Sequence, residues 1–241
     1  MATPSDEMKT KLTWRRFEDG EDQWDSFTDK IFNEDTSHKC PTYVHKTPPC
    51  QGSCPSGEDI RGWLAIVRGM EKPAEGMEMG EYAFRRSTEA NPFPSMMGRV
   101  CPAPCQDGCN RNDVDDFVGI NSVEQYIGDT AFKEGFKFET AAALSGKKVA
   151  IIGSGPGSIV TAADVRRAGH DVTIFEAFHK PGGVMVYGIP EFRLPRDILF
   201  NEIEGILELG IRLKTGVRVG ERSAFSAWPP SVYIVSVPVS A

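Results

Sequence analysis

Six cysteines are the residues in this chain whose type and spacing could most directly do chemistry. The chain opens with the polar stretch MATPSDEMKTKLTW, which has no apolar region of a secretory signal, so a disulfide framework is not expected. We therefore expect a cytoplasmic protein whose cysteines bind a metal or act in catalysis. The spacing is Cys40-x9-Cys50-x3-Cys54, then a gap of 46 residues, then Cys101-x3-Cys105-x3-Cys109.

The cysteine spacing favours an iron–sulfur cluster over zinc. Cys50-x3-Cys54-Pro55 matches the end of the bacterial ferredoxin run, in which the last cysteine binds a different cluster from its neighbours. Prolines, together with Gly52 and Gly108, are expected to keep these segments in loops, where backbone N–H groups can point at sulfur. Zinc is the alternative, but structural zinc sites usually show four ligands in closely spaced pairs.

A glycine-rich segment supplies a second candidate site. It follows an apolar run at residues 149–152, precedes a helical pattern at residues 159–168, and is followed by a second apolar run that ends before Glu176. In such a unit the turn approaches a pyrophosphate at a helix N-terminus, and the acid hydrogen-bonds a ribose. Either FAD or NAD satisfies this pattern. The turn consists of Gly153, Ser154, Gly155, Pro156, Gly157 and Ser158, with Ser158 in place of the third glycine.

Helices and strands must position these residues. Ser56 and Asp59 resemble a capping box, and apolar residues at helical spacing predict a helix over residues 60–67, directly after Cys54. Further helices are expected at residues 75–86 and 121–132. The strand–turn–helix–strand unit begins near Lys147, and a helix at 196–209 and a strand at 211–214 follow it. The sequence therefore predicts a small helical domain that bears the cysteines, followed by an α/β domain.

Composition excludes several classes of protein. The 241 residues are 40% hydrophobic and 25% charged, which is ordinary for one or two globular domains. The net charge is −7, but residues 1–36 carry ten acidic and five basic side chains, so the remainder is close to neutral. We therefore expect no binding to nucleic acid or to an anionic membrane surface. No membrane span is expected, because the longest late apolar run, residues 232–239, is interrupted by Pro238.

Four segments together carry a resemblance to a known family. They are PCQGSCP at residues 49–55, GRVCP at 98–102, Cys109-Asn110, and GINSVEQYI at 119–127. They resemble the N-terminal iron–sulfur domain of the glutamate synthase small-subunit family, which includes the N-terminal part of dihydropyrimidine dehydrogenase. The resemblance extends from about residue 40 to residue 220. It implies two 4Fe-4S clusters with interleaved ligands: Cys50 and Cys109 with Cys40 on one, and Cys54, Cys101 and Cys105 on the other.

Each cluster then lacks one ligand. For the second cluster the family places a non-cysteine side chain on the helix after the last cysteine, and the matching residue here is Glu124; the alternative is a solvated helix face. For the first cluster the chain departs from the family's Cys-x2-Cys-x4-Cys run, because Thr42 and His45 occupy its first two positions and Cys40 lies upstream. His45 is a candidate ligand, since imidazole can replace thiolate on iron; an ordinary loop histidine is the alternative.

The resemblance also favours FAD over NAD as the ligand of the glycine-rich turn. PGG at residues 181–183, YGIP at 187–190 and FRLP at 192–195 look like the segment that follows the FAD fingerprint in this family. It implies that Gly182 and Gly183 pass close to the flavin and that Arg193 is an electrostatic partner of the cofactor, unless Arg193 is only a surface charge. Family members continue with an inserted NAD(P)H-binding domain and closing strands, neither of which we expect in this chain.

Together these patterns predict an α-helical two-cluster iron–sulfur domain followed by an incomplete α/β Rossmann-like FAD-binding domain. We divide the chain into an acidic arm (1–36), the iron–sulfur domain (37–145) and the FAD-binding domain (146–241), with a divergent tail from about residue 222. The expected function is electron transfer between FAD and two 4Fe-4S clusters in an NAD(P)H-dependent oxidoreductase. NAD(P)H would bind only through the domain that is not expected here.

The expected partner is a redox subunit: the large synthase subunit, sulfite reductase or a ferredoxin-like acceptor. Sulfite reductase enters because residues 40–50 differ from glutamate synthase and resemble the iron–sulfur flavoproteins that serve dissimilatory sulfite reductase. Two alternatives remain open from the sequence: an iron–sulfur electron-transfer or docking subunit without a functional flavin site, and a zinc-stapled binding module.

Overall fold

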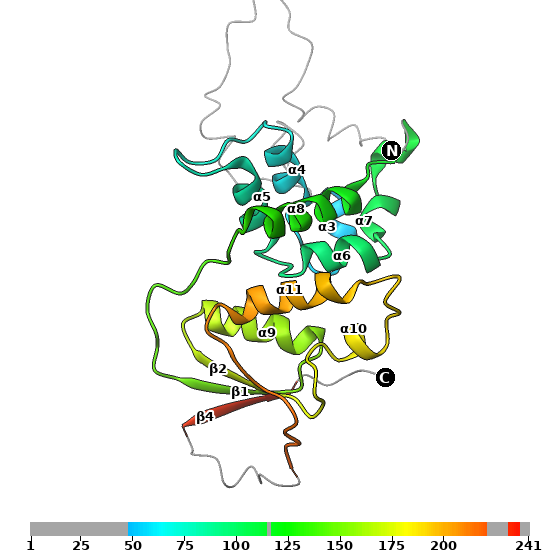
Figure 1. Ribbon diagram of the computed structural model, residues 1–241. Coiled ribbons are helices and arrows are strands. Elements are labelled where there is room, and N and C mark those ends of the chain that lie inside the picture. The colour runs from blue at the N-terminus through cyan, green and yellow to red at the C-terminus, as the bar shows by residue number, and fades with distance from the viewer. Residues whose placement is uncertain (1–47, 115–116, 221–230, 237–241) are drawn as a thin grey trace, which may run out of the picture. The chain divides into compact units, whose positions relative to one another are not determined.

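Short helices carry or flank the described cysteines. The computed structural model describes residues 48–114, 117–220 and 231–236, so Cys40 and His45 lie outside the described residues. The first half contains, in order, α3 (Pro49–Ser53), α4 (Ile60–Val67), α5 (Met79–Ser87), α6 (Pro94–Val100), α7 (Pro104–Asp107), the 3-10 helix η1 (Asn110–Asp113) and α8 (Ile120–Glu134) (Figure 1).

Prolines and glycines were expected to keep the cysteine segments in loops, and this is wrong for Cys50 and Cys105, which lie in short helices, while Cys54, Cys101 and Cys109 lie outside helices as expected. Pro49, Pro94 and Pro104 stand at the starts of α3, α6 and α7. A proline is tolerated there because its missing N–H would have no partner within the helix, and its fixed φ is already helical. Gly52 lies inside α3 rather than in a loop.

The longer helices were predicted from spacing with small errors at their ends. The helix after Cys54 is α4, but its N-cap is Asp59, whose side chain accepts a hydrogen bond from Gly62 N at 3.2 Å, and not Ser56. The helix expected at 75–86 is α5, which begins only at Met79. The helix expected at 121–132 is confirmed as α8 and is longer at both ends.

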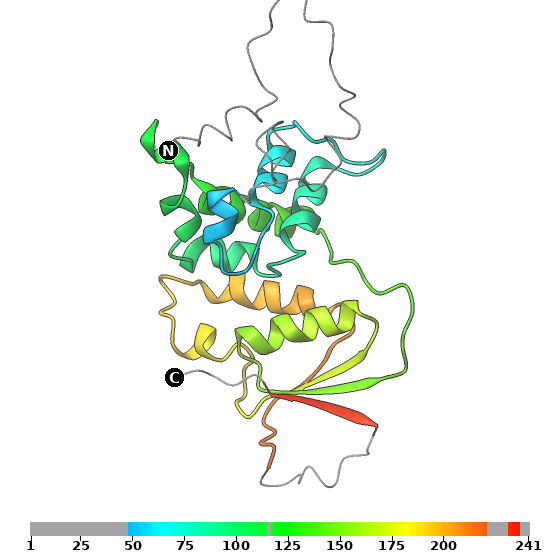
Figure 2. The ribbon, with the colours of Figure 1, turned by 180° about the vertical axis from the view of Figure 1, so that it is seen from behind.

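The second half is a parallel sheet with helices on one face. Its elements are β1 (Lys148–Ile152), α9 (Pro156–Arg167), β2 (Asp171–Phe175), α10 (Val184–Tyr187), α11 (Arg196–Leu207), β3 (Arg212–Lys214) and β4 (Val232–Ser236). The strand order is β3-β2-β1-β4, and every neighbouring pair is parallel. Both views show α9 and α11 on the same side of the sheet (Figures 1 and 2). The predicted strand–turn–helix–strand unit is confirmed.

Strand β4 was not predicted from the sequence. It lies in the tail that was expected to diverge from about residue 222, and it pairs with β1 in a register that places Val235 beside Ile151. The strand order therefore reverses between β1 and β4, because β2 and β3 lie on the other side of β1. In open α/β sheets ligands bind at the carboxyl ends of the strands at such a switch point.

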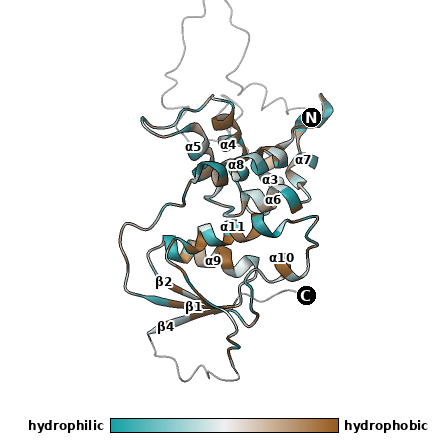
Figure 3. Cartoon of the chain, viewed as in Figure 1, coloured by the Kyte–Doolittle hydropathy of each residue, from teal (hydrophilic) through white to brown (hydrophobic). Residues whose placement is uncertain are grey.

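Two groups of buried side chains form the core of the described unit. One lies between the sheet and its helices and includes Ile151, Ile174 and Ile203; the other lies within the helical half and includes Trp63 and Ile127. Hydrophobic residues follow much of β1 and β2 (Figure 3). None of the helices in the described ranges combines the length and apolar character that a membrane crossing requires.

Helix α6 packs closely against α8 through glycines. A Cβ atom added at Gly128 of α8 would lie 2.6 Å from Ser95 Cα, and closer still to Ser95 N. Helix α6 also joins the core of the α/β half, because Phe93 and Met96 pack in the same buried group as Ile203. The helix is thus packed between α8 and α11.

We predict that Gly128→Ala lowers the free energy of unfolding by about 1–3 kcal/mol, because α6 must shift to accept the new methyl group. Gly205→Ala is the matched control, since Gly205 also lies inside a long helix but its Cβ would meet only Phe138 Cε2 at an ordinary 3.7 Å. That control is expected to be neutral or slightly stabilising. Denaturant unfolding measures both, and equal effects of the two substitutions would contradict the close packing.

A second prediction concerns pH. Burial raises the pKa of Glu202, on α11, to about 8, against the lowering effect of its backbone N–H donors and of Arg99. The native state therefore keeps a proton that an unfolded glutamate, with a pKa near 4.5, has released. The free energy of unfolding is expected to fall between about pH 5 and pH 8, by up to about 1.4 kcal/mol per pH unit from this residue.

The variant Glu202→Gln removes this contribution, so the difference in thermal midpoint between variant and wild type should change steadily across that pH range. Asp129 and Glu124 also face this region, and they remain in both proteins. Glu208→Gln, on the same helix but half-exposed, is the control. A wild-type-minus-variant difference that is independent of pH would refute the raised pKa.

Candidate functional site

The described thiols fall into two electrostatic groups. Cys50 and Cys109 interact with each other, and burial together with the charge of Cys109 raises the pKa of Cys50. Cys54, Cys101 and Cys105 interact among themselves, and burial, followed by the charges of Cys101 and Cys54, raises the pKa of Cys105 to about 11. The structure therefore groups the described thiols in the way that the resemblance implied, while Cys40 of the first set lies outside the described residues.

The short helices explain how the two sets form. Cys50 lies inside α3 and Cys54 at its C-terminal end, while Cys105 lies in α7 and Cys109 directly before η1. Helices α3 and α7 touch where Gly108 meets the side chain of Ser53. Each of these helices ends before its second cysteine, because Cys54 and Cys109 have extended backbone, so the two thiols of each pair do not follow one helical face.

A backbone N–H points at sulfur in the second group, as the sequence predicted. Ala103 N donates to Cys101 Sγ at 3.3 Å. Ala103 has a φ of 56°, a left-handed conformation that non-glycine residues adopt at a cost of about 1–3 kcal/mol. Hydrogen bonds to sulfur are one of the means by which proteins tune cluster potentials.

Glu124 lies with the second thiol group. It is only 6% exposed, which excludes the alternative of a solvated helix face. Its negative charge raises the pKa of both Cys101 and Cys105. Asn91 Nδ2 donates to Glu124 Oε1 at 2.6 Å, and Glu58, also buried, hydrogen-bonds to it. The site thus offers three thiols and one carboxyl group.

Glu58 and Asn91 were missed by sequence reasoning. Burial raises the pKa of Glu58 and of Glu124, and the charge of Glu58 raises the pKa of Glu124 further. Glu58 stands two residues before the start of α4 at Ile60, and nothing in its spacing marks it. Only the packing of α4 and α5 against α8 brings it to Glu124.

The donor set suits an iron–sulfur cluster. Within residues 48–114, 117–220 and 231–236, no group of three or more His, Cys, Asp or Glu side chains converges closely enough to hold a single metal ion. Ligands of a 4Fe-4S cluster bind its separate corners, so they surround a group larger than one ion. Three thiolates supply soft ligands for iron, and Glu124 supplies a hard one.

The glycine-rich turn lies at the carboxyl end of β1, at the switch point of the sheet. Helix α9 begins at Pro156 with Gly155 as N-cap, and no side chain caps its first amides. Backbone N–H groups at such a helix start can bind the phosphates of a nucleotide. The turn is thus placed where the sequence predicted it, between β1 and α9.

The segment at residues 181–183 folds back onto this turn. Gly182 N donates to Ser154 O at 3.0 Å, and a Cβ atom at Gly183 would lie 2.9 Å from Gly155 Cα. Gly183 also has a φ of 53°. Only a glycine can approach the turn so closely, and Gly182 and Gly183 therefore lie directly beside the turn.

The side chain of Glu176 is held against the glycine-rich turn by hydrogen bonds. It is 5% exposed, and its Oε2 accepts hydrogen bonds from Ser154 N at 2.8 Å and from Ser154 Oγ. Its Oε1 accepts from Phe178 N at 2.8 Å. The structure therefore shows Glu176 supporting the turn, in addition to the ribose role that the sequence predicted for it.

Arg193 and Arg196 differ in their surroundings. Arg193 is exposed in the loop before α11. Arg196, which sequence reasoning did not single out, donates to Met185 O and Ile189 O, both at 2.6 Å. Arg196 thus ties the segment after Gly183 to the start of α11.

We predict that Glu176→Ala lowers the free energy of unfolding by about 2–4 kcal/mol, because the Ser154 and Phe178 amides both lose their acceptor. Glu176→Gln retains one acceptor oxygen and should lose less. Glu191→Ala, an exposed glutamate in the following loop, is the control and should have little effect. Thermal unfolding compares the three variants; similar midpoints for Glu176→Ala and Glu191→Ala would show that Glu176 does not support the turn.

Two family models match the two halves of the chain that contain the candidate sites. Residues 22–136 match the family model described as dihydropyrimidine dehydrogenase domain II, 4Fe-4S cluster. Residues 151–191 match the model described as an NAD(P)-binding Rossmann-like domain. The two matched segments contain all the described candidate cluster ligands and the glycine-rich turn, respectively.

Several characterised proteins are similar over most of this chain. Glutamate synthase (NADH) of Schizosaccharomyces pombe is 37% identical over 183 residues, which cover 75% of this chain and 8% of the relative. The NADP(+)-dependent formate dehydrogenase subunit beta of Moorella thermoacetica is 35% identical over 196 residues, 72% of this chain and 27% of the relative. The glutamate synthase (NADPH) small chain of Bacillus subtilis is 35% identical over 185 residues, 72% and 36% respectively.

The chain spans between 8% and 36% of the length of these three relatives. The match nevertheless includes the helical half with its two thiol groups and the Rossmann-like half with its glycine-rich turn. The chain therefore belongs to the family in which an iron–sulfur domain of the dihydropyrimidine dehydrogenase domain II type is followed by a Rossmann-like NAD(P)-binding domain, and the glutamate synthase small chains are among its relatives.

Proposed function

We propose that this chain is an electron-transferring module of an NAD(P)H-dependent oxidoreductase, with two 4Fe-4S clusters in its helical half and FAD in its Rossmann-like half. The observation that carries the proposal is the division of the thiols into two groups, Cys50 with Cys109 and Cys54 with Cys101 and Cys105. When bound, FAD would take up electrons in pairs and exchange them singly with the clusters.

The chain's own residues would bind and orient these groups. In this proposal Cys54, Cys101, Cys105 and Glu124 hold one cluster, and Asn91 orients the Glu124 carboxylate. Cys50 and Cys109 hold the other with Cys40 and His45, which lie outside the described residues. The match to a 4Fe-4S family model favours clusters over a zinc-stapled module.

At the Rossmann-like half, the first amides of α9 would bind the pyrophosphate, and Glu176 would hydrogen-bond the adenosine ribose. Gly182 and Gly183 would let the flavin approach the backbone. Arg193 is exposed and available as an electrostatic partner for the cofactor. A nicotinamide nucleotide at the same turn is the competing occupant, because the matching family model is described as NAD(P)-binding.

We also propose that the module works with a partner subunit that accepts or supplies the electrons. The relatives named as a small chain and as a subunit beta support a multi-subunit arrangement. The large synthase subunit, sulfite reductase and a ferredoxin-like acceptor remain the candidate partners. NADH or NADPH would reach the flavin through a further domain.

The test is the content of iron, acid-labile sulfide and flavin in anaerobically purified protein, for the wild type and for the variants Cys101→Ser and Cys109→Ser. The wild type should contain about eight irons, as expected for two four-iron clusters, and one FAD. Each variant should lose about half of the iron and sulfide and keep the flavin. The two variants should lose different EPR signals, because each removes a different cluster.

Other results of this assay would favour a different function. Clusters without flavin absorption would favour a non-catalytic electron-transfer or docking subunit. Zinc without sulfide would establish the zinc-stapled module. The same assay tests the two non-cysteine ligands: unchanged iron content and EPR spectra in His45→Ala or in Glu124→Ala would remove that residue from the ligand set.

A further inference from the structure

We propose that Glu202 is a positioning residue, which sets the orientation of the iron ligand Cys101 from the nucleotide-binding half of the chain through helix α6. The inference rests on the proposed function, since it takes Cys101 as a cluster ligand. It goes beyond that function because Glu202 belongs to neither the cysteine set nor the glycine-rich turn.

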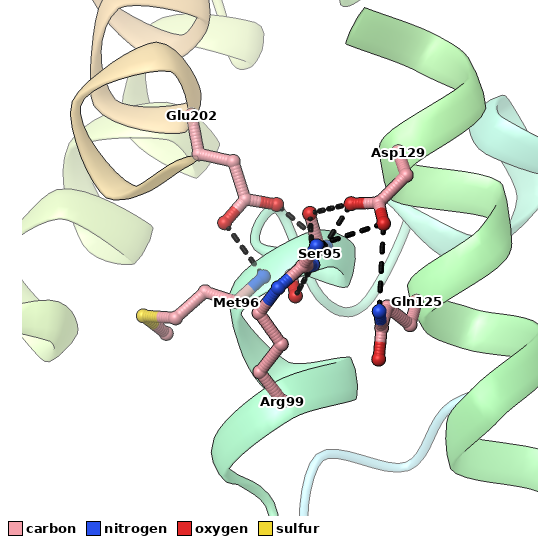
Figure 4. A network of polar contacts seen from close by, with 6 residues as sticks. All are labelled: Ser95, Met96, Arg99, Gln125, Asp129 and Glu202. Carbon is pink, nitrogen blue, oxygen red and sulfur yellow. Dashed lines mark hydrogen bonds and ion pairs between the residues drawn. The ribbon is translucent and has the colours of Figure 1, made fainter. Parts of the chain in front are cut away.

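Glu202 holds the first turn of α6 with both of its oxygens. Ser95 N donates to Oε1 at 2.7 Å and Met96 N to Oε2 at 2.9 Å (Figure 4). The first amides of a helix have no acceptor within the helix, so a carboxyl group whose two oxygens reach two of them fixes both the position and the rotation of the helix. Glu202 is 4% exposed, which leaves water little access to replace it.

Helix α8 holds α6 from the other side. Arg99 Nη1 and Nη2 donate to the two oxygens of Asp129, both at 2.8 Å, and Ser95 Oγ also bonds to Asp129 (Figure 4). The close contact at Gly128 prevents α6 from moving toward α8. The contacts of Glu202 and Asp129 therefore restrain α6 from two sides.

Cys101 lies at the opposite end of the same short helix. It is the C-cap of α6, and its N–H donates to Met97 O at 3.0 Å. Ser95 and Cys101 are separated by about 9 Å of helix at a rise of about 1.5 Å per residue. Over so short a distance a helix moves as one body, so a displacement at Ser95 is carried to the Cys101 thiol.

A continuous set of contacts leads back to the nucleotide site. Gly182 N bonds to Ser154 of the glycine-rich turn, and helix α10 follows directly after Gly183. Arg196, at the start of α11, holds the carbonyl groups of Met185 and Ile189 on either side of the end of α10. Glu202 lies less than two turns further along α11. The turn, α11, α6 and Cys101 are therefore joined by hydrogen bonds and by the short helices α10 and α6.

The position of Cys101 predicts a selective effect. A variant that merely destabilises the protein should affect both clusters alike, whereas Glu202 should act only on the cluster bound by Cys54, Cys101 and Cys105. Replacement by glutamine leaves one of the two α6 amides without an acceptor, because the amide nitrogen of glutamine cannot accept. It preserves the shape of the side chain.

The experiment compares the holoprotein carrying Glu202→Gln with the wild type by EPR and by anaerobic potentiometric titration. We expect changed g values and a shifted midpoint potential for the cluster that Cys101→Ser lacks, with no change in the cluster that Cys109→Ser lacks. Glu208→Gln is the matched control: it lies at the end of the same helix, pairs with Lys137 and should change neither cluster.

Arg99→Lys provides a second route if Glu202→Gln yields no folded protein. It breaks the two-fold contact with Asp129 on the other side of α6 and should shift the same cluster only. Two normal clusters with unchanged spectra in the folded variants, or equal shifts of both clusters, would overturn the role of Glu202 while leaving the proposed function intact. A wild type without iron–sulfur clusters would overturn both.

Discussion

Helix α6 begins with backbone N–H groups that have no partner inside the helix, and the Glu202 carboxyl group of α11 accepts hydrogen bonds from two of them. This contact joins the helical half to the α/β half of the described unit. The side chains of Phe93 and Met96 then enter the core beneath the sheet helices, so the contact is supported by buried apolar surface as well. Because α6 ends at Cys101, the same helix that joins the halves also presents a candidate iron ligand. The fold and the site thus depend on a single short element.

Local patterns predicted much of this arrangement, and long-range contacts account for what they missed. Helical spacing of apolar residues located α4 and α8, and the glycine-rich turn located the start of α9. The helix α6 was missed because Pro94 to Val100 is only seven residues and has mixed polarity. Strand β4 was missed because its partner, β1, lies about eighty positions earlier, and a short apolar run gives no sign of which strand it will join. Nothing in the sequence distinguishes Glu202 from another glutamate on a helix. Only the packing of α6 against α11 shows that Glu202 accepts hydrogen bonds from Ser95 and Met96.

The candidate cluster site gathers groups that repel one another when ionised. Cys54, Cys101 and Cys105 lie with Glu124, and Glu58 is hydrogen-bonded to Glu124. Burial raises the pKa of several of these groups, so without a metal they hold protons. A bound metal reverses this situation, because ligands must release their protons to bind and the cation then compensates their charge. The sequence located the thiols correctly, but only the packing of α4 and α5 against α8 showed that a second carboxyl group accompanies Glu124.

Glu176 can support the glycine-rich turn and bind a nucleotide with the same carboxylate. Glu176 already accepts hydrogen bonds from Ser154 and Phe178, so its carboxylate is held in place before any nucleotide arrives. A carboxylate oxygen can accept more than one hydrogen bond, which leaves capacity for a ribose hydroxyl. An acid fixed in this way loses little further freedom on binding, and that lowers the entropic cost of recognising the ribose. The contacts that support the turn are therefore compatible with its predicted ligand, and they explain why the acid at the end of β2 is buried against the glycine-rich turn.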